Sequence, residues 1–231
     1  MVRRLLKVVR NTSAASRCDI LIVSAGKSGS TYLSLCISKK RVHHVHSLVS
    51  DFYFKFKYQK FYQKVSYQVL LRFTKLVWWA LTIKRSPSII VFPYRDNEQH
   101  RRSLLFNDFE DFVFWFKTSH KKEYRISRYK NSTEFLSCVQ DVMVAENPTE
   151  RFFNEWRYIL GDENLRVPVN DSPVLEFFKR KAKVFIVSSE ALTEFVKNHD
   201  DIFDSPTAGK VNQSEEFWWS PLYVSFKNER E

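Results

Sequence analysis

A short polar loop with a single lysine follows an apolar run near the start of the chain. Glycine is scarce, since the 231 residues contain only four, and two of these flank Lys27 and Ser28. Glycine permits positive φ and a close approach of backbone to a ligand, so this clustering indicates a local demand. Lysine, hydroxyls and the N–H groups that open a helix can together hold one phosphate or sulfate group. The candidate anion-binding loop is Gly26, Lys27, Ser28, Gly29, Ser30 and Thr31.

The phosphate loop of nucleoside triphosphatases, G-x-x-x-x-G-K-[ST], matches this loop only in its second half. Its first glycine would fall at Leu21, inside the apolar run 20–24. Too few residues then separate the end of the run from Lys27 for a loop that wraps a triphosphate. The spacing favours a shorter loop for one phosphate or sulfate group. Two alternatives remain. The loop could belong to a divergent P-loop kinase, or it could be a simple strand-to-helix turn with an exposed lysine.

A second cationic group, Arg95, follows the apolar run 89–92. Its planar guanidinium can make charge-assisted hydrogen bonds to a phosphate. With both segments the chain resembles the sulfotransferases that use 3′-phosphoadenosine 5′-phosphosulfate (PAPS). Residues 26–32, GKSGSTY, resemble the family's 5′-phosphosulfate loop, P-K-S-G-T-T-W, with glycine in place of proline. Residues 95–106 resemble its 3′-phosphate motif, R-[DN]-P-x-x-R-x-x-S-x-[FY], although Asn97 replaces the proline and His100 the second arginine.

The resemblance implies an α/β, P-loop-like fold, PAPS as co-substrate, no metal, and transfer of sulfate to a hydroxyl. It implies that residues 26–31 hold the 5′-phosphosulfate, with Lys27 on the leaving oxygen, and that Arg95 and Ser103 hold the 3′-phosphate. Residues 41–48, 152–156 and 184–192 are similar to bacterial capsular polysaccharide synthesis proteins, a branch of the superfamily that suggests a carbohydrate acceptor. Further candidate phosphate contacts are Arg101, Arg102 and Lys210, although a solvated surface position is the favoured interpretation of Lys210.

A general base for sulfate transfer would come from the histidines of residues 42–46. Alternation along a strand places Val42, His44 and His46 on one side and His43 on the other. His46, nearest the carboxyl end, is our preferred base, with His44 and Asp51 as alternatives. A structural or surface role is the competing interpretation of each histidine.

The elements that position these residues are predicted from hydrophobic patterns. Four apolar runs, each followed by a segment of helical character, predict a mainly parallel sheet flanked by helices. Ligands of such sheets bind beyond the carboxyl ends of the strands. The predicted strands are 20–24, 42–46, 89–92 and 183–187. The predicted helices are 30–39, 98–117, 133–145, 148–160 and 189–196, with a basic aromatic helical insertion at about 52–84.

Composition favours one folded domain, 1–231, whose formal net charge of +11 implies anionic partners. Three cysteines without metal-type spacing indicate neither a disulfide framework nor a zinc site. Residues 69–83 are interrupted by Arg72 and Lys75, so they predict a helix packed on the core, or one lying on a membrane surface. We expect a cytoplasmic enzyme that either associates peripherally with a membrane or diffuses freely. Its expected partner is a glycan acceptor and not a nucleic acid. A non-catalytic polyanion-binding protein of the same fold is the alternative from another class.

Overall fold

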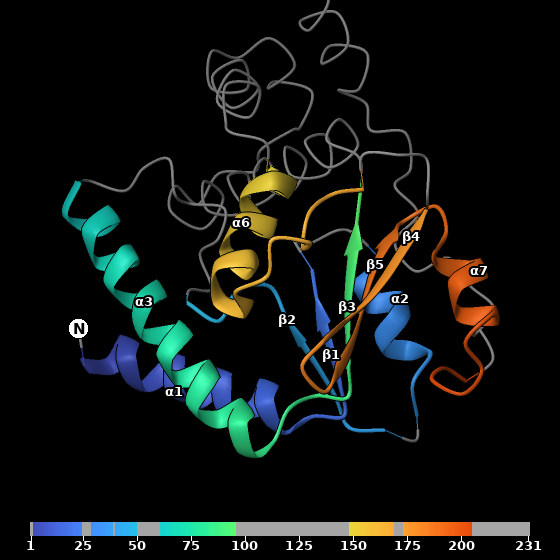
Figure 1. Ribbon diagram of the computed structural model, residues 1–231, viewed down its shortest axis with the longest axis horizontal. Helices are drawn as coiled ribbons and strands as arrows, with labels where there is room; N and C mark the ends of the chain where they lie inside the picture. Colours follow the sequence, from blue (N-terminus) through green and yellow to red (C-terminus); the bar gives the residue numbers. More distant parts are fainter. Residues whose placement is uncertain are drawn as a thin grey trace, which may run out of the picture. The chain divides into compact units, whose positions relative to one another are not determined.

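The computed structural model describes residues 2–24, 29–38, 40–49, 61–95, 148–168 and 173–204. Within these residues five strands form one sheet in the order β2-β1-β3-β5-β4 (Figure 1). The strands are β1 (Ile20–Val23), β2 (Val42–Val45), β3 (Ile89–Tyr94), β4 (Val174–Lys179) and β5 (Ala182–Ser188). β4 runs antiparallel to β5, and the other neighbours are parallel. The protein is therefore α/β with a mostly parallel sheet, as the apolar runs predicted.

Helices cover both faces of this sheet (Figure 1). One face packs against α1 (Val2–Arg17), α3 (Phe61–Lys84) and α6 (Pro148–Leu160), and the other against α2 (Ser30–Leu35) and α7 (Leu192–Lys197). Successive side chains of a strand point to opposite faces, so Leu21 and Val23 join the first core while Ile20 and Ile22 join the second. Burial on both faces explains why β1 is apolar at all four positions.

Helix α6 supplies the aromatic centre of the first core. The rings of Phe152, Phe153 and Trp156 lie 6.2, 6.0 and 5.9 Å from the ring of Phe92 in β3. All four side chains are buried. The spacing of Phe152, Phe153 and Trp156 along α6 places all three on one side of the helix. The helix begins at Pro148. Proline suits the first turn because a backbone N–H at that position would have no partner within the helix.

Helix α3 confirms the predicted basic aromatic helix over its described part, while residues 52–60 lie outside the described residues. It buries one side against the first core, where α1 packs beside it through Val8 and Ala15. Among the described helices, none has the length and apolar character that crossing a bilayer requires. Among the side chains of α3 whose burial is described, the buried ones are Leu70, Leu71, Thr74, Trp78 and Thr82.

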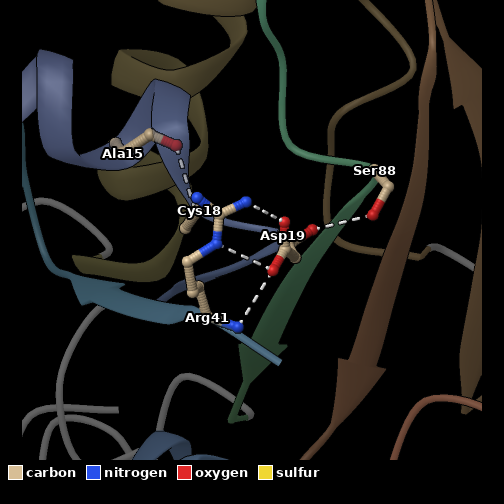
Figure 2. Close-up of polar contacts among 5 residues, drawn as sticks. All are labelled: Ala15, Cys18, Asp19, Arg41 and Ser88. Atoms are coloured by element: carbon tan, nitrogen blue, oxygen red, sulfur yellow. Dashed lines mark hydrogen bonds and ion pairs between the residues drawn. The ribbon is translucent and has the colours of Figure 1, made fainter. Parts of the chain in front are cut away.

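A group of polar contacts aligns the amino ends of three strands (Figure 2). Arg41, before β2, donates from Nε to Oδ2 of Asp19 (3.1 Å) and from Nη2 to Oδ1 (2.6 Å). The carbonyl oxygen of Asp19, before β1, accepts from the N–H (3.0 Å) and hydroxyl (2.9 Å) of Ser88, before β3. The hydrogen bonds from Arg41 lower the pKa of the Asp19 carboxyl. Beside them, the Cys18 thiol donates to the carbonyl oxygen of Ala15, at the end of α1.

Two described elements were not predicted from the sequence. In α1 half of the buried side chains are polar, Thr12 and Ser16, so its buried side does not form a continuous apolar stripe. Strand β4 joins β5 through Arg180 and Lys181, a turn without the glycine or asparagine that marks most two-residue hairpins. Arg180 takes a positive φ of 55° there.

The other predicted elements agree with the structure apart from their ends. The four predicted strands are present, and their boundaries differ by at most two residues. The helix predicted at 148–160 has those bounds, while the one predicted at 189–196 begins only at Leu192. The helix predicted at 30–39 ends at Leu35, although Cys36 and Ile37 still face the core. The helices predicted at 98–117 and 133–145 lie outside the described residues.

The chain divides into two compact units. One comprises Met1–Arg95 with Thr149–Val211, and holds the sheet and every helix described above except the first residue of α6. The other comprises Asp96–Pro148 with Asn212–Glu231. The single domain 1–231 stays a prediction.

Candidate functional site

The carboxyl edge of the sheet gathers the ends of the three strands that carry the predicted site. The chain passes from β1 to β2 on one side, then crosses to β3 on the other side of β1. This reversal is a topological switch point, where open α/β sheets bind ligands. Ser24 follows β1, His46 follows β2 and Arg95 follows β3. The β1 and β3 loops predicted to hold the two ends of PAPS therefore leave neighbouring parallel strands.

The structure describes part of the predicted site. Arg95 is half-buried at the end of β3, and Ser30 is buried at the start of α2, where Thr31 is exposed. Ser30 and both histidines, His44 and His46, converge on Ser24. Several predicted site residues lie outside the described residues, namely Gly26, Lys27, Ser28, Asp51, Arg101, Arg102, Ser103 and Lys210.

Ser24 is the centre of this cluster, although it was not among the residues predicted to form the site. Its Oγ lies 3.0 Å from Oγ of Ser30, 2.9 Å from Nε2 of His44 and 3.1 Å from Nδ1 of His46. Its backbone N–H donates to the carbonyl oxygen of Val45, which continues the β1–β2 pairing past the strand end. The available signal was a small hydroxyl residue directly after a buried strand, on the same side as Ile22. The hydrogen bonds link the start of α2 to two histidines of β2.

His46 has its two ring nitrogens in different roles. Nδ1 lies 2.8 Å from the carbonyl oxygen of Ser24, which can only accept, so Nδ1 carries a hydrogen. In the neutral ring the lone pair therefore resides on Nε2. The side chain is exposed at the carboxyl edge. The backbone of Ser24 thus fixes the ring of His46 and leaves Nε2 as the nitrogen that can accept a proton.

His44 is less suited to accept a proton. Its pKa is lowered to about 4, chiefly by burial and to a smaller extent by the charges of the nearby His46 and His43. Its Nε2 is engaged by Ser24, and its ring meets the ring of His46 edge-on at 4.7 Å. His44 and His46 do lie on the same side of β2, as strand alternation predicted. The structure therefore separates them into a neutral, half-buried histidine and an exposed one.

The structure explains why one of the two clustered glycines, Gly29, is a glycine. Gly29 precedes α2 with φ 85°, a left-handed conformation that other residues adopt at a cost. A Cβ at this position would lie 2.3 Å from Cδ1 of Leu192 in α7. Glycine is thus required both by the backbone turn and by the close approach of α7.

A buried carboxylate lies behind β2 on the other face of the sheet. Ser47 donates its hydroxyl to Oε1 of Glu155 (2.6 Å), and Tyr67 donates its hydroxyl to Oε2 (2.5 Å). These bonds join the end of β2 to α6 and α3. Buried carboxylates require such partners, so this group holds the segment that carries His46 against the core.

The described part of the carboxyl edge is suited to proton transfer and anion binding. It offers a guanidinium, hydroxyls and an oriented imidazole, and no group of three potential metal ligands occurs in the described residues. No protein-family model, no curated protein and no solved structure matches this chain.

Proposed function

We propose that this protein is a PAPS-dependent sulfotransferase that transfers sulfate to a hydroxyl, with a carbohydrate as acceptor. The observation that carries the proposal is the pairing of β1 with β3 at the switch point of the sheet. The loop resembling the 5′-phosphosulfate site follows β1, and the segment resembling the 3′-phosphate site begins at Arg95 after β3. A single bound nucleotide can bridge two loops that leave adjacent strands at the same edge.

The proposed reaction needs one cation and one base. An acceptor oxygen forms a bond to sulfur while the bond from sulfur to the 5′-phosphate oxygen breaks, which leaves adenosine 3′,5′-bisphosphate. Lys27 would stabilise the charge on the leaving oxygen, as cationic groups do in phosphoryl transfer. The acceptor proton would pass to Nε2 of His46, whose Nδ1 hydrogen is held by the carbonyl oxygen of Ser24. His44, with its lowered pKa, is the weaker candidate.

Nucleotide binding is the direct test. Calorimetry should detect binding of adenosine 3′,5′-bisphosphate without magnesium. Loss of a charge-assisted hydrogen bond costs about 1.5–3 kcal/mol, so Arg95→Ala should weaken binding roughly 10- to 100-fold. Lys27→Ala should also weaken binding. Arg85→Ala is the matched control, because this exposed arginine precedes β3, at the end of the strand opposite to Arg95. The affinity of this variant for the bisphosphate should equal that of the wild type.

Three outcomes would contradict the proposal. A folded wild-type protein that does not bind the bisphosphate is not a PAPS enzyme. Preference for ATP with magnesium would instead identify the divergent P-loop kinase. Steeply salt-dependent binding of polyanions without nucleotide binding would identify the non-catalytic alternative.

The role of His46 is tested separately from binding. His46→Ala should retain affinity for the bisphosphate but lower turnover by about 10²–10⁴-fold with an accepted hydroxyl substrate, the usual range for a lost general base. His44→Gln, two residues away, should lower turnover much less if it acts only through packing. Equal losses in both variants would remove His46 from its proposed role.

A further inference from the structure

Helices α1 and α3 have the same unusual charge content. α1 contains five basic residues and α3 contains four, and neither contains an aspartate or glutamate. The whole chain has 26 acidic residues, so their absence from two long helices that pack on one another is a local property. The two helices therefore present a positively charged part of the molecule, one suited to an anionic partner.

The outer side of α3 also carries exposed apolar side chains in a straight line. Val69, Leu76 and Ile83 recur every seven residues, so they share one side of the helix, opposite the buried Thr74 and Trp78. Leu76 is 70% exposed and Ile83 is 73% exposed. At 1.5 Å per residue the line extends over about 21 Å. Such a line is costly in water and indicates a surface that meets something apolar.

The outer side of α1 combines the two features. Val2, Leu6 and Val9 are exposed, and the spacing of four and three residues places them on one side. Beside them run Arg3, Arg10 and Arg17, again seven residues apart and all exposed. Within the described residues no ion pair involves any of these three arginines. The name lipid face is used below for the exposed residues Val2, Arg3, Leu6, Val9, Arg10 and Arg17 of α1 with Val69, Arg72, Leu76 and Ile83 of α3.

We propose that the lipid face docks on an anionic lipid bilayer, with its apolar side chains entering the headgroup region and its arginines on the lipid phosphates. Apolar side chains flanked by arginines match the boundary between acyl chains and anionic headgroups. A second copy of the chain fits poorly, since it would bring basic helices against basic helices without an acidic residue between them. A soluble polyanion would use the arginines but leave Leu76 and Ile83 in water. The inference is independent of the proposed sulfate transfer.

Vesicle sedimentation tests the proposal on the full chain. The wild type should bind vesicles of phosphatidylcholine with roughly a third phosphatidylserine, bind phosphatidylcholine alone much less, and lose affinity as salt rises. Leu76→Ser with Ile83→Ser removes apolar surface while keeping every charge, and should weaken binding about tenfold or more. Arg3→Gln with Arg10→Gln should weaken binding and flatten the salt dependence. Both pairs are exposed, so circular dichroism should report an unchanged fold.

The matched control is Phe178→Ser, which removes an exposed apolar side chain, 71% accessible, from the edge strand β4. It should bind vesicles as the wild type does. Absence of vesicle binding by the wild type would overturn the proposal. The proposal would also be overturned if Phe178→Ser weakened vesicle binding as much as the Leu76 and Ile83 pair does. It would likewise be overturned if that pair did not change vesicle binding, because the contact would then depend on charge alone. Self-association in the ultracentrifuge that the pair abolishes would instead assign the face to a second copy.

Discussion

His44 and His46 differ in chemistry although they share one side of the same strand segment. The difference comes from Ser24, whose carbonyl oxygen binds Nδ1 of His46 and whose hydroxyl meets Nε2 of His44. The ring of His46 is exposed and oriented, and the ring of His44 is half-buried. Burial favours the neutral form of an imidazole, which is why the pKa of His44 falls to about 4. At neutral pH His44 is therefore an uncharged packing partner of the candidate base.

The lowered pKa of His44 predicts an acid-sensitive contribution to stability. In the unfolded chain the imidazole of His44 binds a proton near pH 6.5, and in the folded chain only near pH 4. The contribution of His44 to stability is therefore present above pH 6.5 and is lost as the pH falls through 4. The full difference in pKa corresponds to roughly 3–4 kcal/mol, and because the ring is only partly buried, solvent screening should reduce the loss in the free energy of unfolding to about 2–3 kcal/mol. Denaturant titrations of the wild type and of His44→Gln between pH 7.5 and 4 should show that the free energy of unfolding falls less in the variant than in the wild type. Parallel curves would mean that the ring is not buried in its neutral form.

At the scale of elements, the positions of α2 and α7 depend on one another. α2 begins after Gly29, and the backbone there passes so close to α7 that a methyl group would overlap Leu192. Ser30, the first residue of α2, lies in the Ser24 cluster. The contact between the two helices on this face therefore determines where the start of α2 meets the carboxyl edge of the sheet.

A double-mutant cycle tests this contact. Gly29→Ala should lower the free energy of unfolding by roughly 2 kcal/mol or more, because alanine at φ 85° is strained and its Cβ overlaps Leu192. Leu192→Ala alone should cost about 2–5 kcal/mol as a buried large-to-small change. The double variant should lose less than the sum, since the shortened side chain no longer meets the new methyl group. Strict additivity would show that α7 does not approach Gly29 in this way.

At the scale of the whole molecule, the sheet that the described residues form is shared by two hydrophobic cores. Phe92 packs with α6 on one face, and Phe185 packs with Phe195 of α7 on the other, with ring centroids 5.0 Å apart. Because each strand contributes side chains to both cores, loss of packing on one face weakens the support of the other. The strands that carry Ser24, His46 and Arg95 depend on this double burial for their relative positions.

A pair of phenylalanines in neighbouring strands measures that dependence. Phe185→Ala, in β5, should lower the free energy of unfolding by about 3–5 kcal/mol, as expected for a fully buried ring. Phe178→Ala, in β4, should change it by about 0.5 kcal/mol or less, since that ring is exposed. Both effects are measurable by chemical denaturation, and the wild-type transition of this unit should be single. Similar losses at the two positions would contradict the assigned burial of the edge strand.

The sequence by itself determined the α/β class, four of the five described strands, helix α6 and the side shared by His44 and His46. These features follow from local side-chain patterns, in which period two or 3.6 shows which residues are buried. Only the tertiary structure decided that β1 lies between β2 and β3, that β4 pairs with β5, and that Ser24 joins both histidines to the start of α2. Strand order and these hydrogen bonds arise between residues distant along the chain, and no local pattern records such pairings.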